Sequence, residues 1–136
     1  MSYPIADLDG LTTEHAKRLK AIGIRTTERL LVAACSPRGR RTLAMKTEIS
    51  EDTLLGWANM ANRMRIKGIG NDIAKLLEAA GVKTVEQLRY RNPEKLAKAM
   101  AAANAKRKLV RSLPNEKAIV RWISDAAKLD GPKITY

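Results

Sequence analysis

A short basic turn, Ile66-Lys-Gly-Ile-Gly70, holds the residues of this chain that are best suited to bind an anion. Its two glycines allow the backbone to approach a ligand closely, because glycine has no Cβ atom. A helix expected to begin at Asn71 would present unpaired N–H groups and the positive end of its dipole there. The sequence therefore predicts an anion site at Gly68, Ile69, Gly70 and Asn71, bordered by Arg63, Arg65, Lys67 and Lys75.

Two predicted helices position this turn. One is expected over residues 51–65, and the next over 71–80, where the apolar residues recur at helical spacing on one face. Gly81 stops that helix, because the residue after a helix end often needs a positive φ. Thr84 and Gln87 then form the pattern of a capping box that starts a helix over 85–91.

Two helices around a glycine turn resemble the helix-hairpin-helix element. In that family the backbone N–H groups of the hairpin and the start of the next helix hold a nucleic-acid phosphate. The resemblance implies that residues 68–71 grip one phosphate, while nearby cations neutralise its neighbours. A second basic segment, expected to be helical over 105–111, is the other candidate for phosphate contacts through Lys106, Arg107, Lys108 and Arg111, although a solvated helix face explains it equally well.

The turn and its helices occur twice in the chain. Residues 8–30 align with 66–88 at a constant offset of 58, and Trp57 aligns with Trp122 at an offset of 65. We therefore predict a single domain over 1–136, with repeats at about 5–65 and 66–130 and a tail at 131–136. The first copy provides a weaker second anion site at Gly10, Leu11, Thr12 and Lys17.

Some residues of the repeats have two interpretations. His15 and Arg18 replace the apolar Ile73 and Leu76 of the second copy. Either the first turn lacks a preceding helix to cover this face, or the two side chains contact a ligand. Trp57 and its counterpart lie on apolar helix faces, so both are predicted to anchor the core instead of stacking on bases.

The expected fold is all-α, with tandem helix-hairpin-helix repeats forming eight to nine short helices in one compact bundle without a sheet. No run of β-branched residues alternates with period two, and Ala and Leu dominate the apolar residues. Asn104 is expected to interrupt or end an Ala-rich helix. The further helices are predicted at 13–22, from 26 or 27 to about 34, after Ser36-Pro37, at 93–103 and at 116–128.

Charge indicates the class of partner. The net charge is +12, from 26 basic and 14 acidic residues. Residues 66–136 carry +8 of this excess, with 15 basic and 7 acidic residues, against +4 in residues 1–65. Such a surplus favours nucleic acid or another polyanion as the partner, with DNA preferred over RNA.

Several classes of function are disfavoured by composition. A single cysteine, Cys35, excludes an internal disulfide and a cysteine-based metal site, and His15 is the only histidine. We expect no metal, no cofactor and no catalytic residue. No apolar stretch approaches the length of a membrane span, and no charged-then-apolar leader is seen, so a cytoplasmic protein that does not contact membranes is expected.

The order of motifs resembles a bacterial family catalogued as a domain of unknown function and built of two tandem helix-hairpin-helix-type repeats. The resemblance spans about residues 5–130 and implies an all-helical fold and a nucleic-acid-binding role. Two departures weaken the anion sites: Thr12 replaces the second glycine in the first turn, and Asp72 places a carboxylate beside the second. The shared motifs are Ile49-Ser50, Leu54-Leu55, Trp57, Arg65-Ile-Lys-Gly-Ile-Gly70, Leu76-Leu77, Ala80-Gly-Val-Lys-Thr-Val85, Leu109-Val-Arg111 and Trp122-Ile123.

Three functions compete. The first is non-enzymatic, largely sequence-independent binding of nucleic acid, with duplex DNA preferred, by a monomer or weak dimer. The second is a helical scaffold or protein-interaction module in which the glycines only close tight helix junctions. The third, a repair glycosylase or lyase, is disfavoured because the short chain offers neither a base-flipping pocket nor a carboxylate with a recognisable partner.

Overall fold

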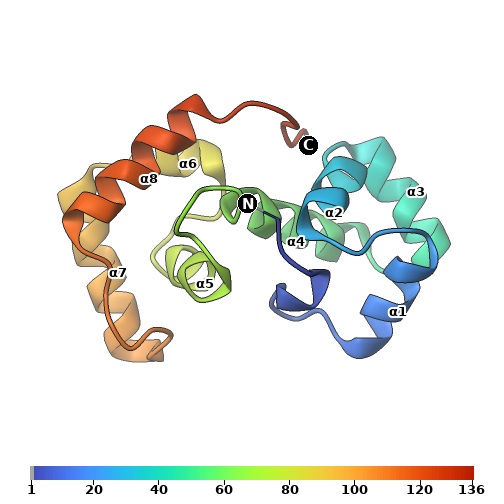
Figure 1. The fold of residues 1–136 in the computed structure, drawn as a ribbon, viewed down its shortest axis with the longest axis horizontal. Coiled ribbons are helices and arrows are strands. Elements are labelled where there is room, and N and C mark those ends of the chain that lie inside the picture. The colour runs from blue at the N-terminus through green and yellow to red at the C-terminus, as the bar shows by residue number, and fades with distance from the viewer. Residues whose placement is uncertain (1) are drawn as a thin grey trace.

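The computed structural model describes residues 2–136, and these form eight α-helices and one short 3-10 helix (Figure 1). The described residues contain no strand, only an isolated bridge between Pro4 and Thr26. The prediction of an all-helical, compact fold without a sheet is therefore confirmed. The 3-10 helix spans Ile5–Asp7, and the α-helices are α1 (Thr13–Ala21), α2 (Thr27–Ala34), α3 (Pro37–Thr47), α4 (Glu51–Arg63), α5 (Asn71–Ala79), α6 (Val85–Arg89), α7 (Pro93–Arg107) and α8 (Glu116–Lys128).

Side-chain caps define where most of these helices begin. In seven of the eight α-helices the residue before the first turn accepts a hydrogen bond from a backbone N–H three residues later. The predicted capping box of Thr84 and Gln87 is present at α6. The seven caps are Thr12, Thr26, Ser36, Ser50, Thr84, Asn92 and Asn115.

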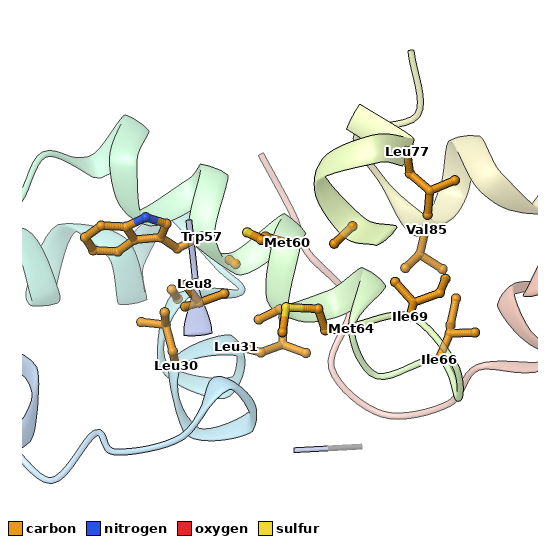
Figure 2. Close-up of a cluster of buried hydrophobic side chains, with 14 of the residues drawn as sticks. Leu8, Leu30, Leu31, Trp57, Met60, Met64, Ile66, Ile69, Leu77 and Val85 are labelled. Carbon is orange, nitrogen blue, oxygen red and sulfur yellow. The ribbon is translucent and has the colours of Figure 1, made fainter. Parts of the chain in front are cut away.

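Helix α4 connects the two halves of the molecule. It packs against α2 and α3 on one side and contacts α5 and α6 on the other. In Figure 2, Met60 and Met64 lie between the leucines of the first half and Ile66 and Ile69 of the second. The buried side chains of both halves therefore form one continuous hydrophobic cluster, in which α8 covers α6 and α7.

The C-terminal tail returns from the second half to the first. In Figure 1 the chain leaves α8 and ends beside α2. The buried Arg40 side chain donates to the carbonyls of Ala34 (2.9 Å) and Thr135 (2.6 Å), and Thr135 N–H donates to the Cys35 carbonyl (2.8 Å). The tail, whose position was not predicted, thus provides a further connection between the halves.

The prediction for the end of α7 was wrong. Asn104 does not end this helix, which continues to Arg107, and residues 108–111 are not helical. Lys108 adopts a left-handed conformation with φ 49°. The Asn104 side chain then pairs with both the N–H and the carbonyl of Val110, at 3.0 Å each. This pairing folds the basic segment back against the end of the helix.

Deleting residues 133–136 tests the role of the tail. The deletion leaves the buried Arg40 guanidinium with only the Ala34 carbonyl, so we expect the free energy of unfolding to fall by about 1–3 kcal/mol. Urea denaturation measures the loss. The same deletion in an Arg40→Met background should lower the free energy of unfolding clearly less, because the Arg40 guanidinium that bonds the tail is already absent. Equal costs in the two backgrounds would contradict the proposed coupling.

Candidate functional site

The second glycine turn is held rigidly from the inside. Ile66 and Ile69 are fully buried, and the Ile69 N–H donates to the Ile66 carbonyl at 3.0 Å. Gly68 has a φ of +92°, a conformation that L side chains rarely adopt. Of the four N–H groups predicted to face an anion, that of Ile69 is therefore used within the turn. Lys67 and Gly68 are exposed.

The start of α5 differs from the other helix starts. Its cap residue, Gly70, has no side chain, and α5 is the single α-helix of residues 2–136 without a side-chain cap. The first N–H groups of a helix have no carbonyl within the helix to bond. The N–H groups of Asn71, Asp72 and Ile73 therefore make no hydrogen bond within the described chain, and they lie beside an exposed lysine, Lys67.

The corresponding helix start in the first copy has a side-chain cap. Thr12 Oγ1 accepts from the His15 N–H and His15 Nδ1 accepts from the Thr12 N–H, both at 3.2 Å. The N–H of Leu11 is also used, by the Leu8 carbonyl. Of the weaker second site, Gly10, Leu11, Thr12 and Lys17, the backbone donors of residues 11 and 12 are thus occupied, while Lys17 is exposed.

His15 and Arg18 each have a structural role that neither interpretation included. The His15 ring packs edge-on against Trp57, with ring centroids 5.1 Å apart. Arg18 donates to the Thr47 carbonyl at the end of α3 (3.1 Å) and pairs with Glu14 (3.3 Å). The polar face of α1 is therefore covered by α3 and by a tryptophan of α4, so no ligand is needed to explain it.

The two tryptophans cover the two glycine turns. Trp57 and Trp122 are about 95% buried, which confirms their prediction as core residues. Trp57 Nε1 donates to the Asp9 carbonyl beside the first turn at 3.1 Å. A Cβ atom at Gly68 would lie 2.9 Å from Trp122 Nε1, closer than real contacts permit. Glycine at this position is therefore required by packing as well as by φ.

Arg63 lies inside the protein, so it does not border the predicted anion site as an exposed cation. It is 2% exposed, and its guanidinium donates to the carbonyls of Lys83 and Ala74 and pairs with Glu78 at 3.7 Å. Burial lowers the pKa of Arg63 to about 10, and the nearby Glu78 carboxylate opposes this shift. The guanidinium remains charged at neutral pH, where it ties α4 to α5 and to the segment before α6.

Two further predicted cations have partners within the protein. Lys75 forms an ion pair with Asp9 (3.4 Å), which links α5 to the first turn. Arg65 donates to Asn62 Oδ1 (3.0 Å) and to the Asp130 carbonyl (2.7 Å), and burial lowers its pKa while Glu28 opposes the shift. Both side chains therefore contribute to the packing of the halves and the tail.

The remaining predicted cations are exposed and separated into two places. Lys67 lies at the turn, whereas Lys106, Arg107, Lys108 and Arg111 lie at the end of α7 and in the loop that follows. In Figure 1 this loop lies at the lower margin of the molecule, at the end of α7. No hydrogen bond or ion pair in residues 2–136 joins the two groups.

Two features at the turn bear on its chemistry. Asn71 Oδ1 is buried and has no hydrogen-bond partner in the described chain. Asp72 is exposed and its carboxylate does not cap α5. The open helix start therefore presents N–H donors with one carboxylate beside them. The buried amide oxygen could not have been inferred from residue spacing, because it depends on how the turn packs.

Alanine substitutions at Gly68 and Gly70 should show which of these two glycines is required by the packing of the turn. Gly68→Ala combines a positive φ with a clash at Trp122, so we expect a loss of about 1–3 kcal/mol in the free energy of unfolding. Gly70 has a φ of −96° and open space around a Cβ atom, so Gly70→Ala should change stability by less than about 1 kcal/mol. Similar losses in the free energy of unfolding for the two variants, measured by urea denaturation, would contradict this packing.

No helix of the described residues is long and apolar enough to cross a membrane. No significant match was found among curated proteins or among solved structures. The sequence model of one family, described as a domain of unknown function (DUF4332), matches residues 9–129. The match covers both glycine turns and the eight α-helices of the described residues, and the C-terminal tail lies outside it. The chain therefore belongs to the DUF4332 family.

Proposed function

We propose that the protein is a non-enzymatic, largely sequence-independent nucleic-acid-binding protein that prefers duplex DNA. In this proposal the second turn acts as a helix-hairpin-helix element and grips a backbone phosphate. The observation that carries the proposal is the uncapped start of α5, where the Ile73 N–H lacks the side-chain acceptor that the equivalent N–H has in the other seven α-helices. Contacts limited to phosphates hold a protein on DNA without reading its sequence.

The distribution of charge supports the same site. Residues 66–136 carry two thirds of the net charge of +12. Lys67 is exposed beside the open helix start. An anion at a helix start gains from both the unpaired N–H groups and the helix dipole. The exposed cations at the end of α7 and in the loop that follows would contact phosphates elsewhere along the duplex; they are Lys106, Arg107, Lys108 and Arg111.

Closing the helix start should weaken DNA binding without unfolding the protein. Gly70→Thr copies the cap of the first repeat, Thr12, and places a hydroxyl where it can accept from the Ile73 N–H, one of the groups that would hold the phosphate. We expect affinity for a 20-base-pair duplex to fall about tenfold, measured by fluorescence anisotropy. Stability should change by only a few tenths of a kcal/mol. Asp72→Asn, which removes the neighbouring carboxylate, should act oppositely and strengthen binding; unchanged affinity in both variants would exclude this site.

Salt dependence should report how many phosphates are contacted. For duplexes of unrelated sequence we expect similar affinities, weakening by about 0.9 log units per neutralised phosphate for each log unit of salt. Lys67→Glu should reduce this slope, whereas Lys20→Glu, the same charge change on exposed α1, should have a smaller effect. A slope that the two variants alter equally would indicate binding by net charge alone.

A scaffold function is the second candidate, because one observation favours it. Trp122 covers Gly68, so that glycine is required by helix packing whether or not an anion binds. In a scaffold the α5 start would contact an acidic side chain of a protein partner instead of a phosphate. Absence of duplex binding even at low salt would favour this function over the first.

A further inference from the structure

A cavity of about 520 Å³ lies between α4, α6, α8 and the C-terminal tail. Its wall includes Asn59 and Asn62 of α4, Arg89 of α6, Lys128 of α8 and Lys133 of the tail. Small-molecule sites typically have volumes of about 300–1,000 Å³ and lie where separate segments meet. The cavity is distinct from the glycine turns, since neither turn contributes to its wall.

The cavity wall carries a surplus of positive charge. Four cations, Arg65, Arg89, Lys128 and Lys133, line it together with two carboxylates, Glu86 and Asp130. The Glu86 carboxylate pairs with Arg89 at 3.9 Å. Lys128 and Lys133 form no ion pair within the described residues. Two positive charges are therefore left over, which matches a ligand with two negative charges.

Asn62 places a hydrogen-bond donor at the cavity wall. Its side chain is only 8% exposed, and its Oδ1 accepts a hydrogen bond from Arg65 Nε. Its amide nitrogen donates to no described residue and is not fully buried, so it is accessible from the cavity. An acceptor oxygen on a ligand in the cavity could therefore bond this nitrogen.

We infer that this cavity is a binding site for a phosphate monoester. A phosphate monoester carries about −1.5 to −2 charges at pH 7 and three strong acceptor oxygens. These oxygens suit an Arg guanidinium, two lysines and an Asn amide, since hydrogen bonds to charged groups are the strong ones. The donors come from α4, α6, α8 and the tail, so a bound ligand would hold the tail against the helices.

The test follows the Asn62 side-chain amide in ¹⁵N-labelled full-length protein during titration with ribose 5-phosphate. We expect a saturable shift of this signal. The double variant Lys128→Glu, Lys133→Glu should weaken binding about tenfold or more. The control is Lys20→Glu, Lys46→Glu, which makes the same charge change on exposed lysines of α1 and α3 and should leave the affinity within about twofold.

The outcomes separate the sources of the ligand. A shift with a 5′-phosphorylated oligonucleotide, absent with its 5′-hydroxyl form and with ribose 5-phosphate, supports the site and identifies a strand end as the ligand. No shift of Asn62 with any of these compounds, or equal weakening in both double variants, would overturn the inference. None of the substitutions alters the α5 turn, so this result and the result for duplex binding are independent.

Discussion

The packing of α4 against both halves is the constraint on which the rest of the structure depends. Its apolar face contributes Trp57 to the first half and Met60 to the boundary, and it ends in the buried Arg63. That guanidinium bonds two carbonyls of the second half. Charge is tolerated in the interior here because the carbonyls and Glu78 compensate it. The position of the second turn is thereby fixed relative to the first half, and the ion pair of Lys75 with Asp9 reinforces it.

The two copies of the turn share packing but differ in what they leave open. In both, a tryptophan from the last helix of the copy covers the turn, and the N–H of the apolar residue after the glycine is bonded internally. In the first copy Thr12 and His15 form a capping box at the helix start, whereas Gly70 provides no side-chain cap in the second. The differences at these two positions are the basis for assigning the proposed anion site to the second copy.

The local signals in the sequence predicted the helices well. Caps such as Thr84 and Ser36 determine helix starts within one turn of chain, so they can be recognised without knowledge of the fold. The errors arose where distant residues decide the outcome. Asn104 continues its helix because its side chain pairs with Val110, and Arg63 lies inside because three segments converge on it. Charge and proximity to the turn made Arg63 resemble a surface residue, while the docking of the tail on Arg40 had no local signature.

The most direct measurement is a titration of ¹⁵N-labelled protein with a short DNA duplex, in which every backbone amide is followed. We predict that the largest shifts occur at Gly70, Asn71, Asp72 and Ile73, the N–H groups at the open start of α5, and that they are the same for unrelated sequences. Residues 10–13 should shift little, because their helix start is capped. Equal shifts at both turns, or shifts that avoid the α5 start altogether, would contradict the proposed phosphate site.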